Sequence, residues 1–310
     1  YTLALIATMV LASVLPCRGQ VAVAVSAITH LAIALLFLLH GAKLPREAVI
    51  AGLAHWRLHL LVLACTFGLF PLIGMATKPL LTNIVGSQLA LGILFLCALP
   101  STVQSSIAFT SIAGGNVPAA ICAASLSNLV GVVLTPFLVT RLLHQDGVGV
   151  SLEAVEKIAL QILLPFLVGQ LLRRWIGGFV NRHKLLTMVV DRGSILLIVY
   201  SAFGAGTVAG IWRAIPASGL VLCFGVVALL LALAMGIMVA AGRLTQLPRP
   251  DQAVLFFCGS TKSLASGLPI ATAIFPAAMV GATVLPVMIY HMTQLLVCSA
   301  IAQRMARTTA

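Results

Sequence analysis

Lys262 is the residue of this chain whose type and position point most clearly to chemistry. It lies in the polar run 259–263, at the centre of an otherwise apolar segment, and Ser266, Gly267 and Pro269 follow it closely. An ammonium at the middle of a membrane helix costs roughly 2.5–3.5 kcal/mol, and Gly and Pro loosen the helix around it. We therefore expect this segment to line a site rather than to face lipid.

Three roles fit this lysine. It acts as a fixed cation in place of a bound metal ion, as a proton carrier, since burial disfavours the charged form of an amine, or as a structural residue that reaches the interface. Lys262 lies eleven residues beyond Asp251, about 16 Å along a helix, which disfavours the third role. The six acidic residues all lie in connections or near segment ends, so an anionic ligand would be its partner.

A second polar stretch interrupts the apolar segment 80–113. Pro100 removes a backbone donor there, and the freed carbonyl groups and half-helix N-termini suit cations and anions respectively. If the two interruptions meet, they form a site of Gln104, Ser105, Ser106, Ser260, Thr261, Lys262 and Ser263. The residues that would break the two helices are Pro100, Gly259, Gly267 and Pro269. The alternative is that small hydroxyl residues only let membrane helices pack closely.

Three further residues, in two other apolar segments, are candidates for the same site. His291 and Gln294 are three residues apart, on one helix face, and Asn128 has the same spacing from Ser125. His30 lies in the middle of another apolar segment, where we expect a hydrogen bond to a neighbouring helix rather than a ligand.

Composition sets the class of protein. Of the 310 residues, 61% are hydrophobic and 8% charged, whereas soluble domains are about 45–50% apolar and a quarter charged. The net charge of +12 is expected to reflect membrane topology rather than nucleic-acid binding, because no basic stripe with aromatics is present. The seven cysteines lack metal-ligand spacing. No metal site, cofactor or protein partner is evident from the sequence.

Ten apolar segments are expected to span the membrane, at about 20 residues each. They are 1–16, 21–44, 55–77, 80–113, 117–143, 152–176, 185–211, 217–244, 250–275 and 277–306. Five segments in each half would invert the second half relative to the first, and residues 93–97 echo residues 254–258 before each interruption. Interrupted helices at matching places in inverted repeats indicate a transporter's binding site. We expect two five-helix repeats, 1–143 and 152–310.

The basic residues predict the orientation. Alternating connections place 12 Lys and Arg residues on one side and 5 on the other, with Lys262 inside a segment. The richer side is cytoplasmic by the positive-inside rule. Both termini are therefore expected in the cytoplasm, in a bacterial-type inner membrane.

Three stretches carry a resemblance to the bile acid:sodium symporter family over essentially the whole chain. They are residues 98–117, residues 257–263, and the run Tyr290-His291-x-x-Gln294-Leu295. The resemblance implies an all-α fold of ten helices with a core and a panel domain. It also implies that helices four and nine are broken and cross, and that organic anions are taken up with sodium by alternating access.

The family's sodium ligands do not all match. Phe257 stands where the family has a coordinating Glu, and Thr261 and Lys262 stand at its Gln and Asn positions. The third-helix Gln corresponds to Thr66, before Pro71. The Ser-Asn pair of helix four falls near Ser105-Ser106, and Ala120 and Ala124 replace hydroxyl ligands of helix five. A cation site with an ammonium beside it and no carboxylate is repulsive.

We therefore predict a secondary transporter of a small organic anion, without the usual sodium sites and with Lys262 as fixed cation or proton carrier. The alternative is conventional sodium-coupled symport of a bile acid-like anion. An alternative of another class is a membrane sensor or scaffold that binds the ligand without transport. An enzyme is not expected, because no Ser-His-Asp set and no His-Glu-x-x-His helix is present.

Overall fold

The computed structural model describes residues 2–43, 55–143 and 159–309. These residues form helices and connections and contain no strand, which confirms the all-α prediction. The chain divides into two compact units made of interleaved segments. Unit 1 comprises Tyr1–Leu44, Asp146–Pro216 and Leu268–Val284, and unit 2 comprises Pro45–Gln145, Ala217–Gly267 and Leu285–Ala310. This division into compact units does not test the predicted repeats 1–143 and 152–310. The repeats stay a prediction.

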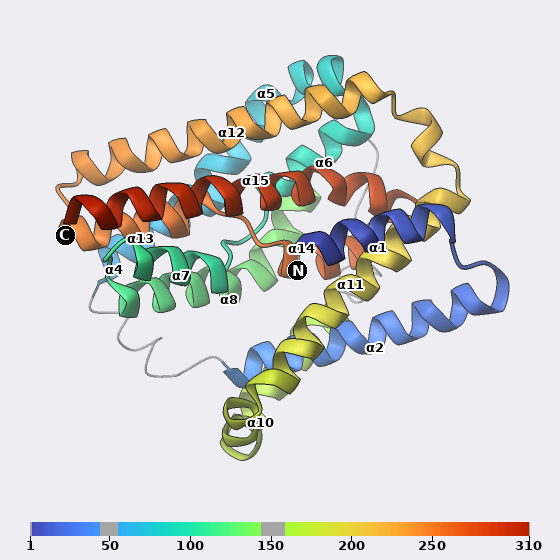
Figure 1. Ribbon diagram of the computed structural model, residues 1–310, viewed down its shortest axis with the longest axis horizontal. Helices are drawn as coiled ribbons and strands as arrows, with labels where there is room; N and C mark the ends of the chain where they lie inside the picture. Colours follow the sequence, from blue (N-terminus) through green and yellow to red (C-terminus); the bar gives the residue numbers. More distant parts are fainter. Residues whose placement is uncertain (1, 44–54, 144–158, 310) are drawn as a thin grey trace. The chain divides into compact units, whose positions relative to one another are not determined.

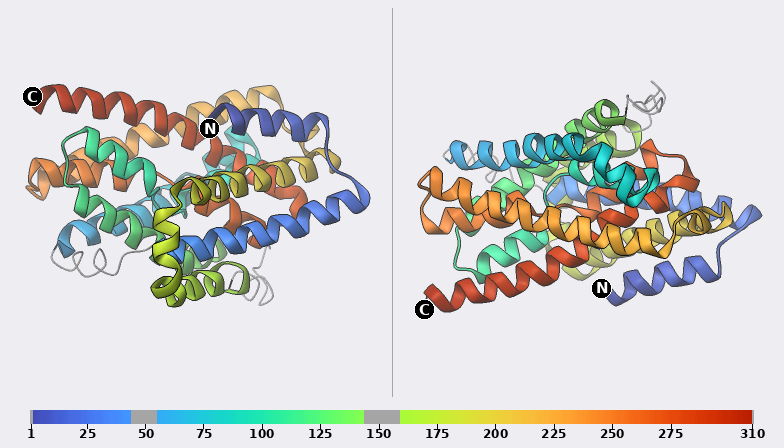
Figure 2. Two further views of the ribbon diagram at one scale, coloured as in Figure 1. Left: turned by 60° about the horizontal axis from the view of Figure 1, so that its bottom comes forward. Right: turned by 90° about the horizontal axis from the view of Figure 1, so that it is seen from above.

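Unit 1 contains the first two helices and a later set. Its complete helices are α1 (Thr2–Val14), α2 (Gly19–Lys43), the π-helix η3 (Ala159–Leu163), α10 (Leu164–Arg182), α11 (Lys184–Val208) and the short 3₁₀-helix η4 (Ile211–Ala214). Helix α11 packs against both α1 and α2, and Figure 2 shows it between them. His30 pairs with Gln161 of η3, as expected for a histidine that bonds to a neighbouring helix.

Two glycines let α2 and α10 cross at very short range. A Cβ on Gly41 would lie 2.1 Å from the carbonyl oxygen of Phe166, and one on Gly169 would lie 2.0 Å from that of Leu38. Only glycine fits such an approach of two backbones, and membrane helices use small residues in this way.

Unit 2 contains the interrupted helices. Its helices are α4 (Trp56–Ala64), the π-helix η1 (Cys65–Leu69), α5 (Phe70–Val85), α6 (Ser87–Cys97), α7 (Gln104–Ile112), α8 (Val117–Leu143), α12 (Ala217–Leu244) and α13 (Arg249–Ser260). Helices α14 (Leu264–Ile274) and α15 (Ala277–Thr309) each belong partly to unit 1 and partly to unit 2. Helix α13 packs against α4, α7, α8 and α12, and it lies among these helices at the left of Figure 1.

Eight helices of the described residues are long and apolar enough to cross a membrane, and two apolar helices, Leu3–Val14 and Ser87–Cys97, are shorter. The segment 217–244 matches α12 residue for residue. The predicted boundary between 77 and 80 is wrong, because helix α5 continues past Pro79 to Val85 and ends at Gly86, whose φ is +83°. Glycine reaches this left-handed region without strain, so Gly86 and not Pro79 separates the segments. Residues 152–158 lie outside the described residues.

Candidate functional site

The two interrupted segments meet inside unit 2. Helix α6 ends at Cys97 and α7 begins at Gln104, while α13 ends at Ser260 and α14 begins at Leu264. The backbone N–H of Ser263 donates to the carbonyl oxygen of Pro100 at 2.8 Å. The interruptions therefore join backbone to backbone, and the polar residues on both sides of them belong to one neighbourhood.

The ammonium of Lys262 lies at the centre of this neighbourhood and is fully buried. Its Nζ donates to the carbonyl oxygens of Thr66 at 2.9 Å, Cys97 at 3.2 Å and Leu99 at 2.8 Å. An ammonium carries three N–H donors, so each donor has one acceptor. Nζ also lies 4.0 Å from the centre of the Phe70 ring, where the ring face attracts a cation. We call these three oxygens and the ring the carbonyl cage.

A proline accounts for the free carbonyl group at one of the three positions, and the end of a helix accounts for a second. In the π-helical register of η1, the N–H of Phe70 donates to Cys65, five residues back, so the group that would satisfy Thr66 is residue 71. That residue is a proline, which has no N–H. The carbonyl group of Leu99 lies beyond the end of helix α6 at Cys97, so no N–H four residues further on is in helical register with it. The sequence thus leaves carbonyl oxygens unpaired where Lys262 donates.

The third carbonyl group of the cage lies at the end of α6. In an uninterrupted helix, the oxygen of Cys97 would accept from the N–H of Ser101. That N–H instead donates to the hydroxyl of Ser127 in α8, at 3.0 Å. Asn128 Nδ2 donates to the carbonyl oxygen of Ser101 at 2.7 Å. Helix α8 thereby holds the first interruption open and leaves Cys97 to Lys262.

Helix α15 holds the second interruption in a matching way. The N–H of Lys262 donates to Gln294 Oε1 at 2.8 Å, and Gln294 Nε2 donates back to the Lys262 carbonyl oxygen at 2.9 Å. The Tyr290 hydroxyl donates to the carbonyl oxygen of Ser260 at 2.6 Å. His291 Nδ1 lies 3.0 Å from Gln294 Nε2. Gln294 and Tyr290 thus satisfy buried backbone groups on both sides of the interruption, which fixes the direction in which Lys262 projects.

A cluster of polar side chains lies beside the interruptions; Thr102 and Ser263 are buried, and Ser105, Asn128 and Ser266 are partly exposed. Ser266 donates to Asn128 Oδ1 at 2.7 Å, and the hydroxyl groups of Ser263 and Ser266 are 3.2 Å apart. The hydroxyl groups of Thr102 and Ser105 are 2.6 Å apart. Ser105 and Ser266 lie in the first turns of α7 and α14, where the helix dipole favours anions; the N–H of Ser266 itself donates to the Ser263 hydroxyl at 3.2 Å.

The predicted site residues fall into two groups. Ser106, Ser260 and Thr261 are fully buried and donate to the carbonyl groups of Thr102, Phe256 and Phe257, within their own segments. These side chains therefore support the backbone. By contrast, Ser105, Asn128 and Ser266 are partly exposed and Gln104 is exposed. The arrangement separates a buried cation from a surface-accessible polar cluster.

The predicted helix breakers lie beside the second interruption rather than in it. The interruption consists of residues 261–263, whereas Gly259 lies in the last turn of α13, and Gly267 and Pro269 lie inside α14. A Cβ on Gly259 would lie 2.4 Å from Met238 Sδ, and one on Gly267 would lie 2.6 Å from a Leu99 methyl carbon. These two glycines therefore serve close packing next to the site. Pro100 lies inside the first interruption, as predicted.

Sequence reasoning missed four contributors to this geometry: Phe70, Ser127, Ser266 and Tyr290. Phe70 carried a signal, because an aromatic residue precedes Pro71 in an apolar segment. Ser127 had none, since a single Ser in a membrane helix is common. The sequence also did not indicate that Asn116 Nδ2 donates to Asp251 Oδ1 at 2.8 Å, which joins the end of the α7 segment to the start of α13.

Within the residues that the structure describes, no carboxylate forms an ion pair with Lys262. Ion pairs among these residues include His40 with Asp191 at 3.7 Å and His55 with Asp251 at 3.9 Å. The same residues contain no group of three or more His, Cys, Asp or Glu side chains that could hold a metal ion. The positive charge at the interruptions is therefore solvated by neutral carbonyl groups and a ring.

Comparison with known proteins identifies the family. The sequence model of the SBF-like CPA transporter family (DUF4137) matches residues 1–307. The chain belongs to this family. This SBF-like transporter is accordingly an integral membrane protein, and its candidate spans are those of a transporter.

Its relatives carry transporter names where they carry a functional name. A protein of Pseudomonas aeruginosa named Uncharacterized protein PA2026 is 54% identical over 99% of this chain and 92% of its own length. The Escherichia coli (strain K12) protein named Putative symporter YfeH is 48% identical over 100% of this chain and 93% of its own length. Sodium/bile acid cotransporter 7 of Rattus norvegicus is 27% identical over 88% of this chain and 81% of its own length.

Proposed function

We propose that this SBF-like transporter moves a small organic anion across a bacterial-type inner membrane by alternating access, without bound sodium. The ammonium of Lys262 supplies the positive charge that a sodium ion would bring. The observation that carries the proposal is the carbonyl cage, in which three backbone oxygens converge on Nζ at 2.8–3.2 Å. Backbone carbonyl groups freed at interrupted helices are the usual ligands of coupling cations in transporters.

The carbonyl cage supports the fixed-cation role over the proton-carrier role. The protonated amine has one N–H for each of the three oxygens. The neutral amine has two, so one buried carbonyl oxygen would lose its partner, at a cost of about 1–3 kcal/mol. Release of a proton would therefore disturb the contact between the two interruptions. A charge that stays in place throughout the cycle fits this geometry.

The anion would bind at the polar cluster of Ser105, Asn128, Ser263 and Ser266. Ser105, Asn128 and Ser266 of this cluster are partly exposed, whereas Ser263 and the ammonium are buried, so the ammonium acts on the anion through space and not by contact. The first turns of α7 and α14 offer N–H groups to the same ligand. Attraction to a buried charge in a low-dielectric surrounding extends over several ångströms.

The fold that we propose for this cycle has ten membrane helices in two inverted repeats, with a core domain that carries the interruptions and a panel domain. Unit 2 contains both interruptions and all the contacts of the carbonyl cage, which supports its role as the core. We assign to the panel the first, second, sixth and seventh apolar segments, 1–16, 21–44, 152–176 and 185–211, all of which belong to unit 1. We further propose that both termini lie in the cytoplasm, following the distribution of basic residues.

Two other functions remain candidates. Sodium-coupled symport is favoured by the name of the rat relative, a sodium/bile acid cotransporter, and would need a sodium site away from Lys262. A sensor or scaffold that binds an anion without transport would have the same polar cluster. We expect neither a cofactor nor a protein partner for the transport cycle.

Uptake by purified protein in liposomes tests the proposal. Radiolabelled taurocholate and two smaller aromatic anions, one carboxylate and one sulfonate, serve as probes, with sodium, potassium or choline as the outside cation. We expect uptake of at least one probe, at equal rates in the three salts, and its loss in Lys262→Ala. Lys78→Ala, which changes another lysine of unit 2, is the matched control and should retain uptake. Uptake that requires sodium would contradict the sodium-free mechanism, and binding without uptake would favour a sensor.

A further inference from the structure

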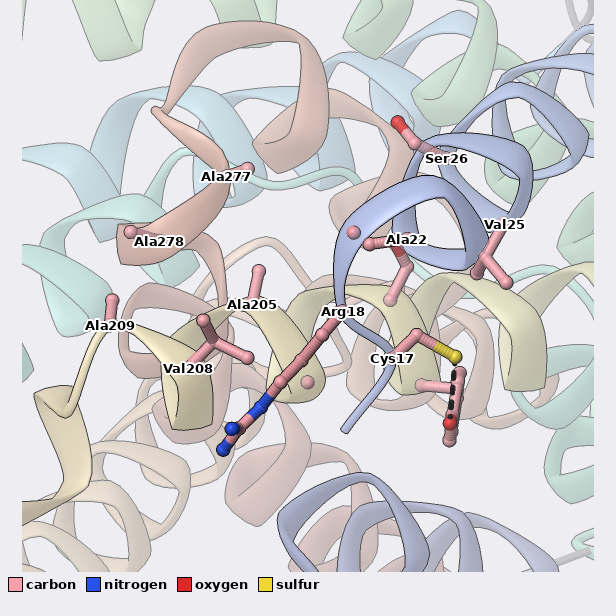
Figure 3. Close-up of a pocket in the computed structure, with 14 residues that line it drawn as sticks. Cys17, Arg18, Ala22, Val25, Ser26, Ala205, Val208, Ala209, Ala277 and Ala278 are labelled. Atoms are coloured by element: carbon pink, nitrogen blue, oxygen red, sulfur yellow. Dashed lines mark hydrogen bonds between the residues drawn. The ribbon is translucent and has the colours of Figure 1, made fainter. Parts of the chain in front are cut away.

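Unit 1 contains a hollow of about 510 Å³, within the range of about 300–1,000 Å³ that is usual for ligand pockets. It is lined by the connection between α1 and α2, the first turns of α2, the last turns of α11 and the first turn of α15. Figure 3 shows these elements surrounding it, with Ala277 and Ala278 opposite Ala22. All its lining residues belong to unit 1, and none belongs to the carbonyl cage.

Small side chains leave this space open. Ala22, Ala205, Ala277 and Gly204 face it from three different helices. Val25 and Val208 complete an apolar wall. Alanine and glycine usually let membrane helices pack closely against each other. Here the same residue types line an open space instead. The lining therefore suits a slender apolar group, such as a hydrocarbon chain.

Charge at the hollow is of one sign. Arg18 is the one charged residue among those of its lining that the structure describes, and its side chain is exposed. In Figure 3 it extends from the start of α2 alongside α11. The first residues of α2 and α15, Gly19 and Ala277, also line the hollow. The N-termini of these long helices add partial positive charge. An anionic group would complement the positive charge of Arg18 and of these two helix N-termini.

The position of Arg18 along the chain sets its depth in the membrane. It directly precedes α2, whose residues Gly19–Ala42 form a candidate span, so it lies at the level where lipid phosphate groups are found. Val21, Val23 and Val208 near the hollow are more than half exposed, as expected for a surface that faces acyl chains. A single molecule that has both a phosphate group and an apolar chain would contact Arg18 with the first and the apolar wall with the second.

We propose that the hollow is a binding site for an anionic phospholipid, with its phosphate on Arg18 and the start of an acyl chain against Ala22, Val25 and Val208. A lipid is favoured over a free anion because the charge lies at the headgroup level and the wall continues onto the lipid-facing surface. The site is separate from the proposed anion cluster of unit 2, so its occupancy and transport can be measured separately.

Native mass spectrometry of the purified protein, titrated with phosphatidylglycerol or phosphatidylcholine, tests this site. We expect one phosphatidylglycerol to bind at least tenfold more tightly than phosphatidylcholine, because phosphatidylglycerol carries a net negative charge, whereas the choline ammonium of phosphatidylcholine offsets the attraction of its phosphate to Arg18. Arg18→Gln should abolish the preference. Ala22→Leu, which fills the hollow, should weaken both lipids. Arg213→Gln, at an exposed arginine of η4 outside the hollow, is the matched control and should keep the preference.

Thermal unfolding in lipid-free detergent controls for folding, and Arg18→Gln should unfold at the wild-type temperature. Equal loss of phosphatidylglycerol binding in Arg18→Gln and Arg213→Gln would show that general surface charge holds the lipid, and would overturn the proposal. So would an Arg18-dependent site that binds free taurocholate more tightly than phosphatidylglycerol. An unchanged preference in Arg18→Gln would overturn it as well.

Discussion

Gln294 offers a direct test of how the second interruption is held. Its side-chain amide accepts from the N–H of Lys262 and donates to the carbonyl oxygen of the same residue, at 2.8 and 2.9 Å. Gln294→Leu keeps the approximate size of the side chain and removes both hydrogen bonds to the backbone of Lys262. Two buried backbone groups then lack partners, because the interruption gives them no helical alternative.

Each unsatisfied buried group costs about 1–3 kcal/mol, so the two together cost about 2–6 kcal/mol. Interhelical hydrogen bonds in membranes average nearer 0.6 kcal/mol, because the unfolded state in the membrane also offers partners. We therefore expect a loss near the lower end, about 2–3 kcal/mol. Thr293→Val is the matched control on the same helix, since its hydroxyl donates only to Ile289 within α15, and should cost under about 0.5 kcal/mol.

The assay is equilibrium unfolding in mixed micelles of dodecyl maltoside and sodium dodecyl sulfate, followed by tryptophan fluorescence. Gln294→Leu should shift the midpoint to clearly lower denaturant than Thr293→Val does. Equal midpoints for the two variants would refute the reasoning, because they would show that the backbone of Lys262 does not depend on this amide.

Two further changes test other contacts of the structure. Tyr290→Phe removes the donor to Ser260 and should cost about 1 kcal/mol in the same unfolding assay; a midpoint equal to wild type would show that this bond is not formed. Gly41→Ala should reduce the yield of folded protein and its thermal stability, because the new Cβ would lie 2.1 Å from a backbone oxygen of α10. Gly178→Ala, with open space around it, should leave both unchanged, and equal losses in the two variants would contradict the close crossing.

The sequence predicted the helices and the presence of an unusual charge, because both depend on local pattern. Long apolar segments define α8 and α12, and Pro100 marks the first interruption. The boundary between 77 and 80 was wrong because helix α5 continues through Pro79, and a proline is tolerated inside a membrane helix when neighbours compensate. The sequence contained the better signal in Gly86, since glycine favours the backbone conformation that ends a helix.

The partners of Lys262 could not be predicted from local pattern. They are backbone oxygens from three positions, and one of them, on Thr66, is free only because η1 adopts a π-helical register before Pro71. Backbone oxygens have no signature in a sequence, and their approach depends on tertiary packing. For the same reason the buried state of Ser106 was not foreseen, since a serine near an interruption suits either a site or its support.

The central claim is that the ammonium of Lys262 takes the place of a bound sodium ion. The most direct measurement is thermal unfolding of the wild type and Lys262→Ala in sodium, choline and ethylammonium chloride at equal ionic strength. The wild type should unfold at one temperature in all three salts. Lys262→Ala should unfold at lower temperature in choline and recover in ethylammonium or sodium, because a cation that binds only the folded state stabilises it. A wild type that sodium stabilises over choline would contradict the claim.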